Sequence, residues 1–139
     1  MNVAYYTMAF DLAFDEFLDR YLDMGYDYCQ QTRVGPFALQ NNFIYTAELN
    51  KGELFYTRLR IMDYDHNKIH MFGQLFRDRD NQLSATWESL NVNVNLDSRK
   101  ATPFAPVIQR NIRSVHGLTV DDPVPEEFGR VPGISHRST

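Results

Sequence analysis

The chain has 139 residues, 43% of them hydrophobic and 14% aromatic, which fits one globular domain with a sizeable core. The formal net charge of −4 leaves no basic surplus to neutralise a phosphate backbone, so a general nucleic-acid role is disfavoured. The single cysteine, Cys29, excludes an intrachain disulfide framework, and no apolar run approaches the roughly 18 residues of a membrane span. We therefore expect a soluble, cytoplasmic protein.

Residues 2–24 are predicted to form a long amphipathic helix. Apolar residues recur there at three- and four-residue steps, and acidic residues fall largely between them. Asn2 is a favourable N-cap, and Gly25 is a favourable residue just beyond a helix end. The pattern indicates one buried face along the whole helix.

Four strands are predicted after a loop that carries Gly35 and Pro36. The segments have a period of two and are separated by short polar turns, which indicates an antiparallel sheet in meander order. The expected strands are 37–49, 53–65, 68–78 and 83–97. In the last strand apolar residues alternate with a row of asparagines, which we expect to face solvent or a partner subunit. This row is Asn91, Asn93 and Asn95.

A short helix over about 103–114 is predicted next, with a proline at its start. The rest of the chain is rich in proline, glycine and charge, so we expect 117–139 to form a tail over the surface. Residues 1–116 would then form a single domain. One amphipathic helix beside a long-stranded antiparallel sheet predicts an α+β fold in which the helix covers one sheet face.

Four stretches carry motifs in order along the chain: MNVAYY, QNNFIYTAELNKGE, NKIHMFGQLFRD and SATWESLNVNVNLDSRKATPF. Their order and spacing resemble the hotdog-fold thioesterases of the 4-hydroxybenzoyl-CoA thioesterase group, most closely the betainyl-CoA thioesterase-like proteins. The resemblance extends to about Phe104. It implies a hotdog fold, in which a curved antiparallel sheet wraps round a long central helix, here with the first strand missing from the chain.

The resemblance rests on individual positions, and two positions depart from the family pattern. The matching residues are Asn2, Tyr6, Tyr45, Glu48, Gly52, Glu53, His70, Phe72, Ala85, Thr86, Glu88, Pro103 and Phe104. Gln40 and Asn42 stand where the family tends to carry Glu and His. An amide side chain cannot act as an acid or a base, so these departures bear on catalysis.

Thioester hydrolysis needs a carboxylate that attacks the carbonyl carbon or activates water, and donors that stabilise the developing oxyanion. In the family the start of the central helix donates backbone N–H groups to the thioester oxygen, so the resemblance assigns this role to the amides near Asn2 and Val3. The family's carboxylate lies upstream of the Asn, where this chain has only Met1. We expect that the chain as given starts late; the alternative is a diverged protein that lacks this residue.

If the carboxylate instead comes from within the chain, the catalytic candidates are Glu48 and Glu88, with Asp11 as a third. Each can also be read as ordinary surface or strand charge. The candidate substrate-binding residues are Tyr6, Gln40, Asn41, Asn42 and His70. Tyr6 and His70 can equally be satisfied core or strand residues.

Arginines and lysines of the strands and turns could form a local patch for the phosphates of coenzyme A, or could be ordinary surface charge. They are Arg58, Arg60, Lys68, Arg77 and Arg79. The histidines outside the strands lack ligand spacing, so no metal site is expected. We expect no cofactor other than the coenzyme A of the substrate.

The leading hypothesis is an acyl-CoA thioesterase or thioesterase-like protein that hydrolyses a small or polar acyl-CoA. The resemblance implies a homodimer or homotetramer with the acyl pocket between subunits. One alternative is a non-catalytic hotdog protein that binds an acyl-CoA or another small ligand. A second is a cone-shaped α+β fold of the nuclear-transport-factor type, which usually has more helix before its sheet.

Overall fold

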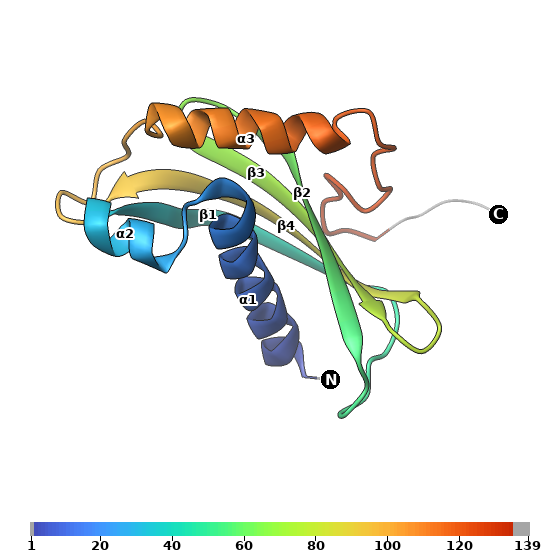
Figure 1. Ribbon diagram of the computed structural model, residues 1–139. Helices are drawn as coiled ribbons and strands as arrows, with labels where there is room; N and C mark the ends of the chain where they lie inside the picture. Colours follow the sequence, from blue (N-terminus) through green and yellow to red (C-terminus); the bar gives the residue numbers. More distant parts are fainter. Residues whose placement is uncertain (1, 135–139) are drawn as a thin grey trace.

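A computed structural model of the chain describes residues 2–134 and contains three helices and four strands within that range. In chain order they are α1 (Val3–Leu22), α2 (Tyr26–Thr32), β1 (Val34–Tyr45), β2 (Phe55–Tyr64), β3 (Lys68–Arg77), β4 (Gln82–Asn95) and α3 (Pro106–Thr119). Figure 1 shows α1 lying against one side of the curved sheet. This is the predicted α+β architecture of a hotdog fold, a long helix wrapped by an antiparallel sheet.

Helix α1 forms because its sequence supplies both a cap and a buried stripe. The Asn2 side chain accepts a hydrogen bond from the Ala4 amide at 3.0 Å, which satisfies one free donor of the first turn. The buried residues of the stripe are Tyr6, Phe10, Phe14, Phe17, Leu18 and Leu22. The helix ends two residues before its predicted end because Asp23 adopts a left-handed conformation, with φ of 54°.

The sequence does not predict the short helix α2. Its segment YDYCQQT buries no residue and shows no apolar period, so no pattern marks it as a helix. Gly25, expected as the stop of the first helix, is instead the N-cap of α2. A Cβ atom on Gly25 would collide with the Asp19 side chain, so the close approach of α1 and α2 requires glycine here.

The sheet has the strand order β1-β4-β3-β2 in the described residues, and all pairs are antiparallel. The four predicted strands exist, but the predicted meander order is wrong for the first, because β1 pairs with β4 and not with β2. β1 also begins earlier than predicted and includes Gly35 and Pro36. Pro36 is tolerated because β1 is an edge strand, where a missing N–H donor costs nothing.

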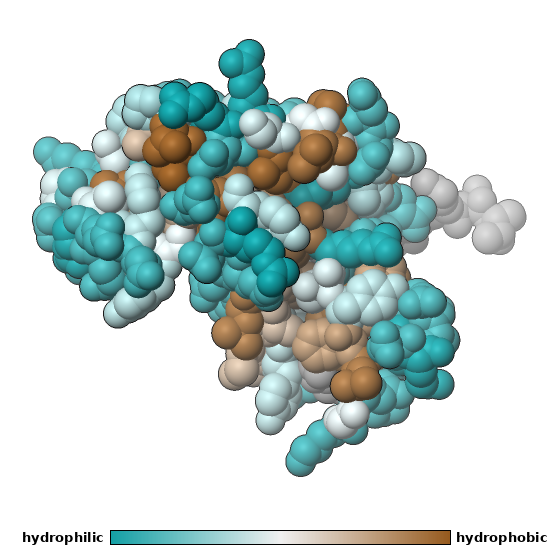
Figure 2. Space-filling model, viewed as in Figure 1, coloured by the Kyte–Doolittle hydropathy of each residue, from teal (hydrophilic) through white to brown (hydrophobic). Residues whose placement is uncertain are grey.

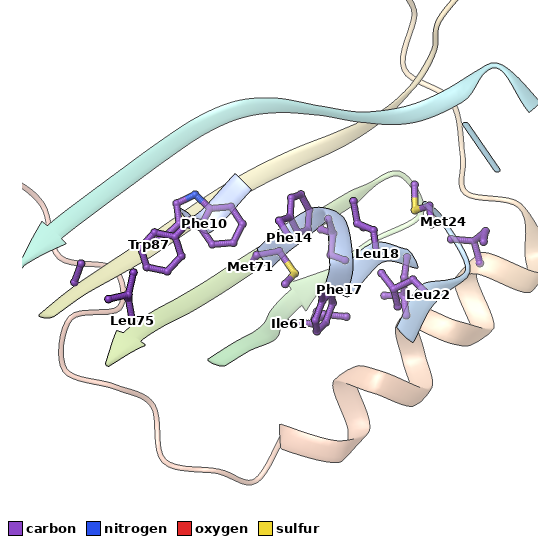
Figure 3. Packing of buried hydrophobic residues seen from close by; sticks show 14 of the residues in the cluster. Phe10, Phe14, Phe17, Leu18, Leu22, Met24, Ile61, Met71, Leu75 and Trp87 are labelled. Atoms are coloured by element: carbon purple, nitrogen blue, oxygen red, sulfur yellow. The ribbon is translucent and has the colours of Figure 1, made fainter. Parts of the chain in front are cut away.

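The inner face of the sheet, toward α1, holds the hydrophobic core (Figure 3). Phe10 of α1 stacks on Trp87 of β4 with ring centroids 5.8 Å apart, and its ring lies 6.1 Å from that of Phe43 in β1. Gly73 of β3 lies directly below Phe10: a Cβ there would come within 3.1 Å of the Phe10 ring and 2.6 Å of Leu59. The absence of a side chain at Gly73 therefore lets α1 approach the sheet.

Two of the three asparagines in the row of β4 are not exposed as predicted, whereas Asn95 is partly exposed. Asn91 and Asn93 are 3% and 1% exposed, and alternation along the strand places them on the inner face with Trp87. The Asn93 side chain donates hydrogen bonds to the carbonyls of Thr102 and Pro103, in the segment that leads to α3. The prediction is wrong because side-chain polarity alone does not reveal an internal hydrogen-bond partner.

Helix α3 covers the inner side beyond the end of α1 and packs on both α1 and β2. It begins three residues later than predicted, with Pro106 in its first turn, and it buries Ile108 and Ile112. It runs through the expected domain boundary at 116 as far as Thr119. In the described part of the chain, none of the helices combines the length and the hydrophobicity that a membrane crossing needs.

After α3, residues 120–134 cross the outer face of the sheet, and we call this segment the strap. Its contacts follow the strand order: Arg60 of β2 donates to the Pro123 carbonyl, Phe128 packs on β3, Gly129 donates to β4, and the Arg130 carbonyl accepts from β1. The predicted tail over the surface therefore takes a defined path across all four strands.

Candidate functional site

The N-terminal end of α1 presents backbone donors to solvent. Asn2 uses its side chain to cap the Ala4 amide and its carbonyl to accept from the Tyr5 amide. The amide of Val3 has no partner within residues 2–134. An unpaired N–H at the positive end of a 20-residue helix is a ready site for an anionic or partly negative oxygen.

Tyr6 lies one turn further along α1 and connects this helix end to the loop after β1. The backbone amide of Leu49 hydrogen bonds to the Tyr6 hydroxyl, and the ring of Tyr45 meets the Tyr6 ring edge-on at 5.1 Å. Burial raises the pKa of Tyr6, and the neighbouring Tyr45 and Glu48 raise it further. Tyr6 therefore stays protonated, and its hydroxyl proton is available to a neighbouring acceptor because the Leu49 amide occupies a lone pair.

Glu48 is the carboxylate that the fold brings near Tyr6 and the start of α1. It is exposed, close enough to Tyr6 to affect its pKa, and in no ion pair within residues 2–134. Its backbone carbonyl accepts a hydrogen bond of 2.7 Å from Arg77, which also pairs with Asp80 at 2.8 Å. The β3–β4 hairpin thus holds the backbone of the Glu48 loop and leaves its carboxylate free.

The other two candidate carboxylates lie elsewhere. Asp11 is on the exposed side of α1, where partial burial and then the charge of Asp15 raise its pKa. Glu88 lies on the outer face of the sheet, 2.7 Å from His70 Nε2, and accepts from the Gly129 amide of the strap. The fold therefore places Glu88 and His70 together, but on the face opposite α1.

The polar cluster of β1 is divided between the two faces. Asn41 accepts a hydrogen bond of 3.1 Å from the Trp87 indole on the inner face, whereas Asn42 donates to the Arg130 carbonyl on the outer face. Gln40 is exposed and follows a bulge in the pairing with β4. Asn41 is thus the member of the cluster nearest to the core aromatics.

The basic residues considered for phosphate binding are mostly engaged within the chain. Arg77 and Arg79 pair with Asp80 and Glu53, and Arg60 donates to carbonyls around the end of α3. Arg58 has no ion pair within residues 2–134 and lies over the rings of Tyr56 and Phe76. Arg58 is therefore the member of the set with a guanidinium free for an anion.

Sequence reasoning missed Trp87, the Leu49 amide and the role of Arg60. Trp87 is the single tryptophan of the chain, and that rarity was the available signal for it. A backbone amide and an arginine that binds carbonyls carry no sequence signal, because their roles arise only from the path of the chain.

Two grooves of about 570 Å³ each are present in the described structure, and neither includes Tyr6 or Glu48. One runs between α1, the free edge of β2 and the end of α3; its lining includes Phe17, Arg58, Leu59 and Thr119. The other lies between the β2–β3 turn and α3. The side chains of Val3, Tyr6 and Glu48, which we call the corner, therefore lie outside both grooves.

An exposed apolar band adjoins this corner. Six large hydrophobic side chains, four in the first half of α1 and two on β1, are between 50% and 63% exposed. They are Val3, Tyr5, Met8, Leu12, Phe37 and Leu39. In Figure 2 apolar side chains gather around the exposed part of α1. Tyr5, Met8 and Leu12 recur at three- and four-residue steps and so share one face of α1, and an exposed apolar face of this kind is typical of an interaction surface.

Comparison with known proteins agrees with this fold. Residues 1–112 match the family model described as the thioesterase-like superfamily. Among curated proteins, the chain is 24% identical to a betainyl-CoA thioesterase of Pseudomonas aeruginosa over 98 residues. These residues are 70% of this chain. The match spans 62% of the length of that relative.

Solved structures share the architecture. A hypothetical protein from Staphylococcus aureus, in complex with CoA, superposes with a TM-score of 0.90 at 24% identity, over 97% of this chain and 84% of that one. A 1,4-dihydroxy-2-naphthoyl-CoA thioesterase from Synechocystis superposes with a TM-score of 0.70 at 14% identity, over 83% of this chain and 84% of that one. With a family model that spans most of its length and a shared hotdog architecture, the chain belongs to the thioesterase-like superfamily.

Proposed function

We propose that the protein hydrolyses an acyl-CoA thioester at the N-terminal end of α1. The observation that carries the proposal is the N-terminal end of α1. The Val3 amide is unpaired there within residues 2–134, and the Tyr6 hydroxyl, one turn further along, contacts the loop that carries the free Glu48 carboxylate. The betainyl-CoA thioesterase relative and the CoA-bound structure support a CoA thioester as the substrate class.

The chemistry follows from the roles of these groups. Glu48 takes a proton from a water molecule as the water oxygen attacks the carbonyl carbon. The Val3 amide, at the positive end of the helix, donates to the oxygen that becomes negative in the tetrahedral intermediate. The C–S bond then breaks, and the proton held by Glu48 passes to the departing thiolate of coenzyme A.

We propose a homodimer as the active form, with a homotetramer as its further assembly. Neither groove of the isolated chain includes Tyr6 or Glu48, although thioester chemistry needs water to be controlled and the acyl group to be enclosed. The apolar band of α1 and β1 adjoins the corner and would provide a self-complementary interface. A second copy would therefore supply the missing wall of the acyl pocket.

We propose a small or polar acyl group for the substrate. Gln40 and Asn41 are exposed on opposite faces of β1, and Asn41, on the inner face, offers an amide group that a long hydrocarbon chain could not satisfy. Neither a metal nor a further cofactor is part of this proposal.

The prediction that a strand ending in an acidic residue precedes the helix concerns residues outside the described range. β2 forms an edge of the sheet, and the groove between β2 and α1 runs beside that edge. Such a strand would lie there, and its acidic residue would then replace Glu48 in the reaction.

The alternative is a protein of the same fold that binds an acyl-CoA without hydrolysing it. The exposure of Glu48 on a loop favours this interpretation, because a catalytic carboxylate is usually partly desolvated.

A panel of short-chain, hydroxylated, cationic and long-chain acyl-CoAs distinguishes these functions. Thiol release is followed spectrophotometrically, and binding of each ester is followed by calorimetry at matched concentrations. We expect turnover for small or polar esters. Glu126→Gln, a change at an exposed position of the strap, should hydrolyse them at the wild-type rate and so controls for the effect of replacing a glutamate. Saturable binding with no thiol release from any ester would establish the non-catalytic alternative.

A further inference from the structure

The strap is held on the outer face of the sheet with few buried apolar side chains of its own. Val120, Val124, Val131 and Ile134 are between 52% and 84% exposed, so most of its apolar side chains do not contribute to a core. Phe128 is the exception. The strap therefore lies on the sheet as a peptide lies on a receptor, through one aromatic anchor and a set of hydrogen bonds.

The aromatic anchor, Phe128, packs against two side chains of β3, and we call the space that they form the slot. The Phe128 ring lies 5.0 Å from the ring of His70 and 5.9 Å from that of Phe72, edge-on to the latter. Phe72 is 1% exposed but does not belong to the hydrophobic cluster of the inner face. Phe128 covers part of the Phe72 ring on the outer face, so release of Phe128 would expose an aromatic surface there.

Backbone groups of the strap are bound by side chains of the sheet. Glu88 Oε1 accepts from the Gly129 amide at 2.7 Å, while Glu88 Oε2 is held at 2.7 Å by His70 Nε2. Asn42 Nδ2 donates to the Arg130 carbonyl at 3.1 Å. These bonds recognise the backbone rather than side chains, and Gly129 has a φ of 74° that few other residues adopt.

Arg60 binds the other end of the strap. Its two terminal nitrogens donate to the carbonyls of Thr119 and Pro123 at 2.9 and 3.0 Å. The strap carries four acidic residues and one arginine, so its net charge complements the guanidinium groups of Arg58 and Arg60 on β2.

From these contacts we propose that the outer face of the sheet is a peptide-binding surface, occupied in cis by the strap. The occupant is the strap of the same chain, an extended acidic segment in which an aromatic residue is followed by glycine. His70 and Glu88 act in this surface as a paired clamp for the strap. Release of the strap opens the slot of Phe72 and His70 without disturbing α1 or the inner core.

The strap lies outside the part of the chain that the family model matches, since that match ends at 112. The match to the CoA-bound Staphylococcus aureus structure covers 97% of the chain, a share that extends well into the strap. The alignment with a solved protein of the same fold therefore includes most of the strap.

Limited trypsin digestion of the full-length protein measures strap opening, because cleavage after Arg130 requires the strap to leave the sheet. We expect Phe128→Ala to raise the cleavage rate at Arg130 at least tenfold, measured by intact mass. Val124→Ala, which also truncates an apolar strap residue to alanine but at an exposed position, should change it less than twofold. Equal rates for the two variants would overturn the anchor role of Phe128.

Binding in trans tests the surface itself. A fluorescent synthetic peptide of residues 120–134 should bind saturably to the full-length Phe128→Ala protein, and at least tenfold more weakly to the wild type, whose own strap competes. The same peptide carrying Phe128→Ala should lose binding. Adding Glu88→Ala to the Phe128→Ala protein should weaken binding of the unmodified peptide at least fivefold.

Circular dichroism and the thermal unfolding midpoint confirm that each protein variant is folded before binding is measured. Absence of saturable binding to folded Phe128→Ala protein would refute a peptide-binding surface. A peptide affinity that changes neither with Glu88→Ala in the protein nor with Phe128→Ala in the peptide would also refute it, because the association would then be non-specific.

Discussion

The two faces of the sheet are built from the same strands but are held by different forces. On the inner face, Phe10, Trp87 and Gly73 fit together in a continuous apolar core with α1. On the outer face, the strap is held by one aromatic ring and by hydrogen bonds to its backbone. The inner face therefore determines stability, while the outer face can open independently of the fold.

The same comparison separates the residues that the family motifs mark. Tyr6 and Glu48 belong to the inner side, at the start of α1, whereas His70 and Glu88 belong to the outer side, under the strap. Side chains one position apart on β4, such as Trp87 and Glu88, point to opposite faces. A single sequence motif can thus contain residues of two unrelated sites.

The largest difference between the faces should appear in stability. Phe10→Ala should lower the free energy of unfolding by about 3–5 kcal/mol, because it leaves a cavity between α1, Trp87 and Phe43. Phe128→Ala should cost much less, since its ring is partly exposed and packs on one side only. Urea denaturation followed by tryptophan fluorescence measures both, with unchanged m-values as the control for two-state unfolding. Similar losses for the two variants would show that the strap is part of the core.

The two carboxylates provide a comparison in activity. For an acyl-CoA that the wild type hydrolyses, Glu48→Gln should reduce kcat by about 100-fold or more, because an amide cannot accept the proton of the attacking water. Glu88→Gln should leave kcat within about twofold, since Glu88 lies across the sheet from α1. Steady-state thiol release measures both. The reverse order would move the reaction to the outer face and remove the role proposed for the α1 terminus.

The sequence predicts the elements with a strong local period and misses what depends on distant segments. The stripe of α1 and the alternation of β2, β3 and β4 are local, and all four elements exist as predicted. The position of β1 beside β4 depends on a connection that no local pattern specifies. Helix α2 is too short and too polar to have a period of its own.

The candidate site shows the same division. The cap at Asn2 is a local property and could be predicted. The meeting of Tyr6 with the loop at Glu48 and Leu49 joins residues more than 40 positions apart, and only the resemblance marked both sides. The clamp of His70 and Glu88 could not be predicted, because its ligand is the strap, a segment without any periodic pattern.

Asn2 allows the capping role and the oxyanion role of the α1 terminus to be separated. Asn2→Ala should cost about 1 kcal/mol through loss of the cap. Asn2→Asp keeps the cap and should preserve stability, because a negative charge is favourable at a helix N-terminus. The same charge should repel the developing oxyanion next to the Val3 amide, so kcat should fall by about tenfold or more. Full activity in folded Asn2→Asp protein would exclude the Val3 amide as an oxyanion donor.

The smallest expected effect concerns the hairpin that holds the Glu48 loop. The hydrogen-bonded Arg77 guanidinium lowers the pKa of Asp80 to about 2, against an ordinary value of 3.8. A carboxyl whose pKa is lower in the folded state contributes stability above the unfolded value, and this contribution is lost as the pH falls through the folded value. The unfolding midpoint of the wild type should therefore exceed that of Asp80→Asn at pH 5 and above, and the two should converge between about pH 4 and pH 2. Thermal unfolding across that range measures the difference. A constant difference at all pH values would show that Asp80 acts through packing, and the Glu48 loop would then be held by the Arg77 hydrogen bond alone.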